Sequence, residues 1–83
     1  MTRNQFNEVL LKSNEICAFE DIFGYNRIVT HYDKNKDRTT LYCIHYEDRG
    51  DGYGYRPETI ETLVKFQGRR ILTFAPIERI KED

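Results

Sequence analysis

The chain has no tryptophan, two cysteines and two prolines, and its acidic and basic side chains nearly balance over 83 residues. A formal net charge of −1 gives no general electrostatic reason to bind DNA, RNA or an anionic membrane. The longest uncharged apolar run is far shorter than the roughly 20 residues that span a membrane. Cys17 and Cys43 have no CxxC spacing, so we expect reduced thiols and no zinc framework.

The first residues also lack a charged-then-apolar leader with a small-residue cleavage site, so secretion by a signal peptide is not expected. We therefore expect a cytoplasmic protein, with residues 1–83 forming one α+β domain. A chain of this length buries only about 60–65% of its unfolded surface, so it supports one modest core.

Residues 25–46 are typical of an antiparallel hairpin. The runs YNRIVTHY and TTLYCIHY are rich in β-branched and aromatic residues, and the polar segment DKNKDR separates them. With a four-residue loop at 34–37, Asp33 faces Arg38 and Ile28 faces Cys43.

This register divides the hairpin side chains between two faces. One face carries Ile28, Thr30, Tyr32, Leu41, Cys43 and His45. We expect this more aliphatic face to pack under a helix. The other face carries Tyr25, Arg27, Val29, His31, Tyr42, Ile44 and Tyr46. We expect this tyrosine-rich face to be half exposed and to be the better candidate for a binding surface.

An N-terminal helix is predicted over about residues 3–14. Thr2 and Gln5 fit a capping box, in which their side chains satisfy backbone donors at a helix start. Phe6 and Leu10 follow on one helical face, so packing of that face must hold this short helix.

Residues 57–67 have two interpretations. The preferred one is a second short helix, because Pro57 suits a first helical turn and Ile60 and Val64 then share a face. The alternative is a strand, because branched and aromatic side chains also alternate from Ile60 to Phe66.

The predicted fold is thus a small α+β domain, in which an antiparallel sheet packs with the helices. Its sheet contains the central hairpin and a strand over about residues 70–75. If residues 57–67 are a strand, they form a second hairpin with residues 71–74, and a small, partly open β-barrel becomes the alternative.

No convincing set of catalytic or metal-binding residues is visible. Ser13 is the only serine, and Cys43 and His45 lack an identifiable third group to orient the imidazole. Asp33, Asn35 and Asp37 resemble the start of an EF-hand loop, but the later glycine and glutamate positions are not filled. We expect no enzyme activity, metal or cofactor.

Protein recognition has the strongest positive case. All six tyrosines lie between Tyr25 and Tyr55, and tyrosine and arginine are enriched at binding hot spots. The candidate partner-binding residues are Tyr25, Arg27, Tyr42, Tyr46, Tyr53, Tyr55 and Arg56. The sequence therefore predicts a non-enzymatic protein-binding module for a larger protein partner. A small inhibitor or adaptor, for example a phage-encoded inhibitor of a host defence protein, fits this description.

Two other partners stay open. Lys65, Arg69 and Arg70 form the one basic cluster and would contact nucleic acid together with nearby aromatics. This alternative is not favoured, because an acidic residue accompanies nearly every other basic one. An exposed strand edge beside tyrosines would also allow two copies to pair as a homodimer.

Overall fold

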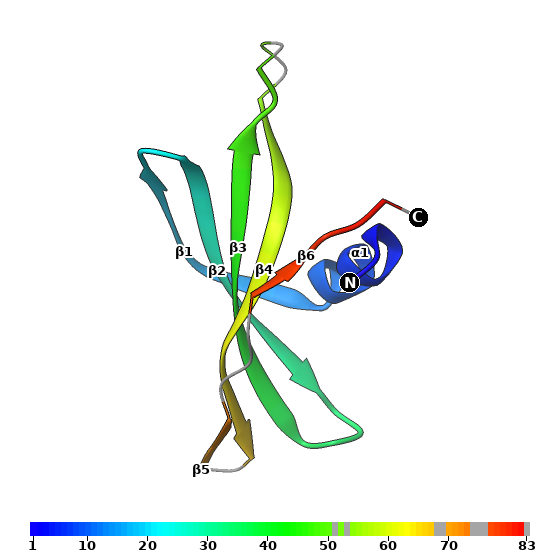
Figure 1. Ribbon diagram of the computed structural model, residues 1–83. Helices are drawn as coiled ribbons and strands as arrows, with labels where there is room; N and C mark the ends of the chain where they lie inside the picture. Colours follow the sequence, from blue (N-terminus) through cyan, green and yellow to red (C-terminus); the bar gives the residue numbers. More distant parts are fainter. Residues whose placement is uncertain (51, 53, 68–69, 74–76, 83) are drawn as a thin grey trace.

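A computed structural model describes residues 1–50, 52, 54–67, 70–73 and 77–82, with only the backbone for 64–67 and 70–73. This part of the chain contains one helix and six strands. They are α1 (Arg3–Leu11), β1 (Ser13–Asp21), β2 (Gly24–Asp33), β3 (Arg38–Asp48), β4 (Tyr55–Gln67), β5 (Arg70–Thr73) and β6 (Ile77–Arg79). Strands β1 to β5 form an open antiparallel sheet in sequence order, and β6 pairs with β4 (Figure 1). The protein is a small, mostly β domain rather than a barrel.

Helix α1 begins as predicted. The Thr2 hydroxyl accepts a bond from the Gln5 backbone at 3.1 Å, and the Gln5 side chain accepts one from the Thr2 backbone at 2.9 Å. The helix ends at Leu11, earlier than the predicted end near residue 14, because Ser13 already belongs to β1. Strand β1 turns into β2 over two residues, Ile22 and Phe23.

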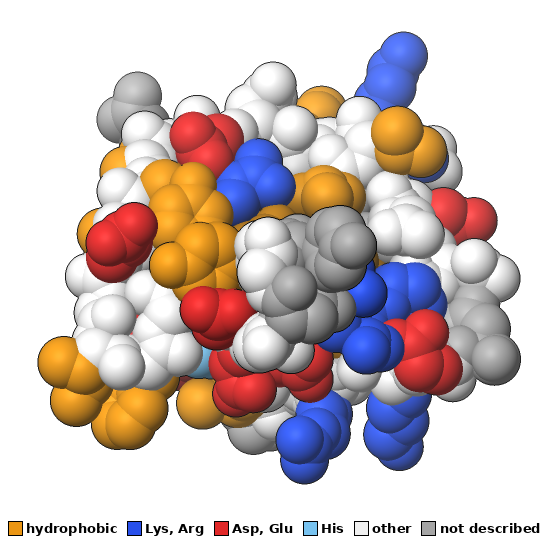
Figure 2. Space-filling model, turned by 90° about the horizontal axis from the view of Figure 1, so that it is seen from above, with side chains coloured by type: hydrophobic (Ala, Val, Ile, Leu, Met, Phe, Trp, Pro, Cys, Tyr) orange, Lys and Arg blue, Asp and Glu red, His pale blue; other side chains and the backbone are white. Residues whose placement is uncertain are grey.

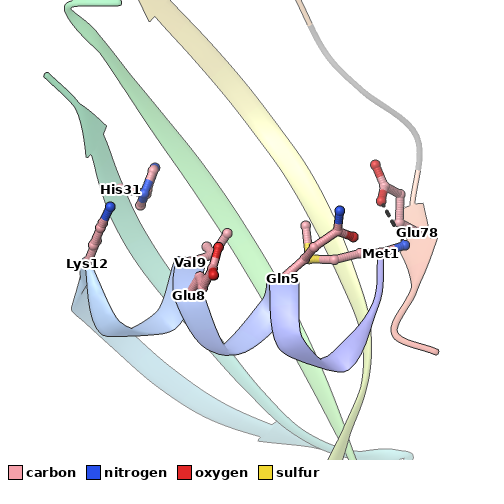
Figure 3. Close-up of a pocket in the computed structure, with 7 residues that line it drawn as sticks. All are labelled: Met1, Gln5, Glu8, Val9, Lys12, His31 and Glu78. Atoms are coloured by element: carbon pink, nitrogen blue, oxygen red, sulfur yellow. Dashed lines mark ion pairs between the residues drawn. The ribbon is translucent and has the colours of Figure 1, made fainter. Parts of the chain in front are cut away.

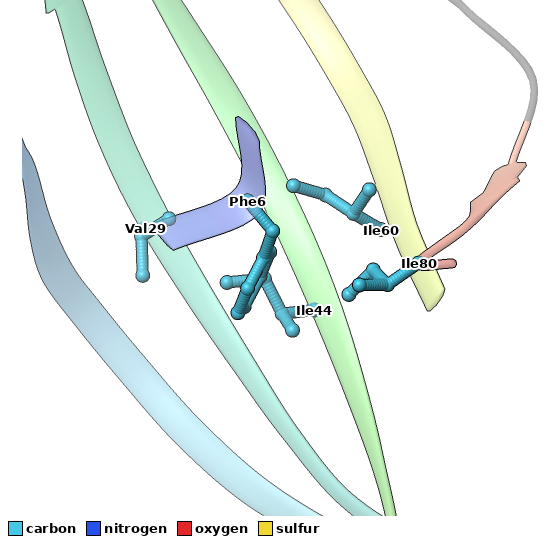
Figure 4. Packing of buried hydrophobic residues seen from close by; sticks show 5 residues of the cluster. All are labelled: Phe6, Val29, Ile44, Ile60 and Ile80. Carbon is cyan, nitrogen blue, oxygen red and sulfur yellow. The ribbon is translucent and has the colours of Figure 1, made fainter. Parts of the chain in front are cut away.

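The predicted hairpin is confirmed together with its register. Strands β2 and β3 pair with Asp33 opposite Arg38 and Ile28 opposite Cys43. The prediction of which face meets the helix is wrong, however, because Phe6 of α1 packs on the tyrosine-rich face. Val29 and Ile44 of that face are fully buried beneath Phe6 (Figure 4).

The composition of the core explains why α1 packs on this face. Ile44 pairs with Ile60 of β4, so adjacent strands present branched aliphatic side chains at the centre of this face. Phe6 and Ile80 complete the buried cluster (Figure 4). Tyr42 and Tyr46 pack around this cluster and leave its centre free for Phe6.

The prediction of a helix over residues 57–67 is wrong, because this segment is strand β4 and pairs with β3 along its length. Two register shifts place an extra residue in β4, Glu58 and Leu63. Each bulge breaks the two-residue period of a strand, so the apolar spacing resembles that of a helix.

The alternative second hairpin is confirmed, with Gln67 of β4 opposite Arg70 of β5. The predicted strand over 70–75 is confirmed for Arg70–Thr73, and residues 74–75 lie outside the description.

The two ends of the described chain lie side by side (Figure 1). Thr2 and Lys81 form a parallel bridge, with Arg3 N donating to Lys81 O at 2.7 Å and Lys81 N donating to Met1 O at 2.8 Å. Ile80 is buried, whereas Ile77 is exposed because it lies on the face opposite the helix. The C-terminal segment therefore closes the core from the side of β4.

The molecule is more extended than a compact chain of the same length. Its radius of gyration is 13.3 Å, whereas a compact chain of this length has about 12 Å. The hairpin of β3 and β4 extends at the top of Figure 1, away from the helix. One face of the sheet is covered by α1 in its middle.

Candidate functional site

Three tyrosines meet at the upper end of the helix-covered face. The Tyr25 ring centroid lies 5.6 Å from that of Tyr46 and 5.8 Å from that of Tyr55, so three strands each contribute one ring. These distances are typical of aromatic pairs. We call Tyr25, Tyr46 and Tyr55 the tyrosine cluster. Figure 2, which looks down on this end, shows hydrophobic side chains interspersed with acidic and basic ones.

Arg27 fixes the edge of the tyrosine cluster. Its Nη1 donates to the Tyr46 hydroxyl at 3.0 Å, and its Nε donates to the Glu15 carboxylate at 2.7 Å. The guanidinium carbon lies 6.0 Å from the Tyr46 ring centroid, at the limit of a cation–π contact. The hydrogen bond that Arg27 donates to Glu15 is the main cause that raises the pKa of Arg27 above its usual value, so this residue stays cationic. Arg27 therefore holds one ring of the cluster, Tyr46, through its hydroxyl.

The remaining candidate partner-binding residues do not join this cluster. Tyr42 lies four positions before Tyr46 on β3, packs against the core and has its ring 6.3 Å from that of His31. Burial raises the pKa of Tyr42. Arg56 forms ion pairs with Glu58 and Glu82, and Tyr53 lies outside the described residues. Tyr25, Arg27, Tyr46 and Tyr55 are thus the part of the predicted surface that the fold brings together.

The alternative nucleic-acid contacts lie at the other end of the molecule. Lys65 belongs to β4 and Arg70 to β5, near the end of the second hairpin, and their side chains are not described. Arg69 lies outside the described residues.

A second polar constellation occupies the face opposite the helix. The Asn26 side chain is buried, donates from Nδ2 to the Asp21 carboxylate at 2.8 Å, and has Oδ1 2.9 Å from His45 Nδ1. An amide oxygen only accepts, so His45 must donate from Nδ1, and a neutral ring then leaves Nε2 as an acceptor. This hydrogen-bonded set of Asp21, Asn26 and His45 was not predicted from the sequence, although the predicted register already placed Asn26 opposite His45.

These residues line an open groove of about 420 Å³. Asn26 and His45 form part of its lining, and Cys43 and Glu61 contribute from the next pair along β3 and β4. Asp21 and Glu47 add two more carboxylates, and Phe23 and Ile77 add apolar side chains. We call this the acidic groove.

Nucleophilic chemistry in the acidic groove is disfavoured. Cys43 and His45 share this face of β3, and Asn26 does orient the imidazole. Burial raises the pKa of the Cys43 thiol, and the negative charges of neighbouring groups, Glu61 first, raise it further. A protonated thiol is a poor nucleophile.

The bonds around Asp21 predict a pH effect on stability. The hydrogen bond from Asn26, followed by that from the Phe23 backbone, lowers the pKa of Asp21 from its usual 3.8. The folded state therefore holds this proton less tightly than the unfolded state, so the stabilisation is present above pH 3.8 and is lost as the pH falls through the lower, folded-state pKa.

We expect Asp21→Asn to lose less of its free energy of unfolding than the wild type between about pH 5 and pH 2. Urea unfolding at a series of pH values measures this difference. Glu20→Gln removes the neighbouring charge and serves as the control. An equal loss in the wild type and Asp21→Asn would show that these hydrogen bonds do not contribute.

A larger hollow of about 500 Å³ lies between α1, β2 and β6 (Figure 3). Figure 3 shows Lys12 and His31 at one end and Met1 and Glu78 at the other. The N-terminal amine of Met1 already pairs with Glu78 at 3.4 Å. The lining mixes both signs of charge, with Glu8 between the two ends, so it does not select one class of ligand.

Within the ranges that the structure describes, no three histidine, cysteine or acidic side chains are grouped to hold a metal ion. No helix among these residues is long and apolar enough to cross a membrane. Comparisons with protein-family models, with curated proteins and with solved structures found no match to this chain.

Proposed function

We propose that this chain is a non-enzymatic protein-binding module, which occupies a surface of a larger protein partner through its tyrosine cluster. The observation that carries the proposal is the meeting of three tyrosine rings with the ordered guanidinium of Arg27. Tyrosine and arginine provide large contact areas and polar handles, and they dominate the energetics of protein interfaces.

The arrangement favours binding because it is ordered in advance. Immobilising a side chain at an interface costs roughly 0.5–1.5 kcal/mol. Arg27 is already held by Glu15 and Tyr46, and Tyr25 contacts two other rings. Much of this ordering has therefore occurred before a partner binds.

The tyrosines divide into contact and core residues. Tyr42 and Tyr46 pack against the buried cluster, which accounts for their presence in a small core. Tyr55 is 47% exposed, and its ring contact is with Tyr25. Tyr25 and Tyr55 are consequently the residues that we assign to partner contact, with Tyr46 and Arg27 supporting them.

A module of this kind acts by blocking or bridging a partner surface, as an inhibitor or an adaptor. An inhibitor of a host defence protein, encoded by a phage and acting in the host cytoplasm, is one example that fits. The tyrosine cluster sets the chemistry of the contact rather than the identity of the partner.

Replacing Tyr25 and Tyr55 together by alanine is expected to weaken partner binding by more than about 1 kcal/mol, because both rings lie in the contact. The measurement is affinity capture from lysates of the source organism and of any cell that it infects, with and without nuclease treatment, followed by quantitative mass spectrometry. Tyr32→Ala is the matched control, since Tyr32 is 52% exposed and bonds to Asp37 in the loop between β2 and β3.

The expected result is a protein retained by the wild type and by Tyr32→Ala but lost from the double variant. Equal retention by all three would contradict the assignment to the tyrosine cluster. Loss of all retained material on nuclease treatment would show that the partner is nucleic acid rather than protein.

A further inference from the structure

We propose that the acidic groove receives an arginine or lysine side chain from an extended, apolar segment of a partner protein. The groove lies on the opposite face of the sheet from the tyrosine cluster, because Asn26 and His45 alternate with Tyr25 and Tyr46 along β2 and β3. This second contact is independent of the proposed function of the cluster and can be tested separately.

The groove lies on a sheet face that no helix of the described chain covers. Helix α1 packs on the other face, through Phe6. The volume of about 420 Å³ is within the range of protein binding sites, which is roughly 300–1,000 Å³. Its floor is rigid, since the buried Asn26 carboxamide is bonded at both ends.

The charged groups of the lining select a cation. Asp21, Glu47 and Glu61 supply three carboxylates, and neither lysine nor arginine lines the groove within the described part of the chain. None of these carboxylates forms an ion pair with another residue that the structure describes. Arg79 lies opposite Thr59 in the pairing of β6 with β4, but it is exposed and does not belong to the lining.

The hydrogen-bonding groups agree with the charges. Carboxylates only accept, and the groove presents those of Glu47 and Glu61 beside the already bonded Asp21. A guanidinium or ammonium group brings only donors, so it complements a groove whose charged groups are acceptors. A phosphate or carboxylate ligand would instead meet three like charges.

The rim of the groove favours apolar residues on either side of the basic residue in the partner segment. Phe23 is 74% exposed and Ile77 is 62% exposed, and both line the groove. Long basic side chains bury their aliphatic stems against such surfaces while the charged head reaches polar groups. An apolar residue on either side of the basic one would cover the remaining surface of Phe23 and Ile77. We therefore assign the groove to a peptide segment rather than to a free metal or amine.

The experiment is a titration of the ¹⁵N-labelled full chain with the blocked peptide acetyl-Leu-Arg-Leu-amide, followed by amide shifts. A matched peptide carries citrulline, which is neutral and nearly isosteric with arginine. We expect the arginine peptide to shift the amides of Asn26, His45 and Thr59, with at least about tenfold weaker binding of the citrulline peptide. The double variant Glu47→Gln and Glu61→Gln should abolish this preference.

Separate outcomes would overturn the assignment. Equal binding of the two peptides, shifts confined to the tyrosine cluster, or no shifts up to about 10 mM peptide would each contradict it. Concentration-dependent association that the glutamine double variant removes would assign the groove to a second copy of the chain. The variant lacking Tyr25 and Tyr55 should bind the arginine peptide like the wild type, so failure here is distinguishable from failure of the proposed function.

Discussion

Replacing Phe6 by alanine should lower the free energy of unfolding by about 3–5 kcal/mol. Phe6 is 2% exposed and is the fully buried residue of α1. Its ring lies over Val29 and Ile44 and beside Ile80 (Figure 4). Removing it would leave a cavity that these residues cannot fill, since rigid β-strands carry two of them.

The expected loss is a large fraction of the total stability of a small domain, which is roughly 5–15 kcal/mol. Urea unfolding followed by circular dichroism measures it. Leu11→Ala is the matched control, because Leu11 lies in the same helix and is 86% exposed. A change within about 0.5 kcal/mol is expected there. Similar losses in the two variants would show that α1 does not pack on the sheet through Phe6.

Replacing Gly24 by alanine is expected to destabilise the protein by about 2 kcal/mol or more. Gly24 opens β2 with a φ of +151°, a conformation that side chains rarely adopt. A Cβ at this position would also collide with the backbone carbonyl oxygen of Tyr46 on β3. Backbone cannot move aside like a flexible side chain, so strands β2 and β3 would have to separate at this end.

Gly54→Ala is the control that separates the two causes. Gly54 has a φ of +93°, but a Cβ there would meet nothing within 4 Å. Its substitution should cost about 1 kcal/mol from backbone strain alone. Thermal and urea unfolding of both variants measure the difference. If the two substitutions had the same effect, the close approach of Gly24 to Tyr46 would carry no energetic weight.

Several features of the fold were predictable because they depend on neighbouring residues. The capping box at Thr2 needs only the side chain of Gln5, three residues away. The register of β2 and β3 follows from a four-residue polar loop, and it correctly placed Asp33 opposite Arg38. That register also placed Tyr25 opposite Tyr46, which are two of the three rings of the tyrosine cluster.

Other features depend on segments far apart in the sequence. Helix α1 packs on this face because Ile60 and Ile80 extend the aliphatic surface around Ile44. The bulges in β4 form only against β3, so the spacing of its apolar residues was misleading.

The candidate site divides in the same way. Tyr55 reaches Tyr25 because β4 is a strand, so a helical interpretation of this segment could not place its ring. Asp21 accepts a hydrogen bond from Asn26 across the tight turn between β1 and β2, and no turn was predicted there from the sequence.

The side-by-side ends of the chain have a consequence for folding during synthesis. Strands β1 to β4 pair with sequence neighbours, so this part of the sheet can form as soon as those residues are made. The core lacks Ile80, and Arg3 lacks its bond to Lys81, until residue 81 has left the ribosome. The nascent sheet therefore exposes apolar surface until Ile80 and Lys81 emerge, and that is the interval in which a chaperone would recognise it.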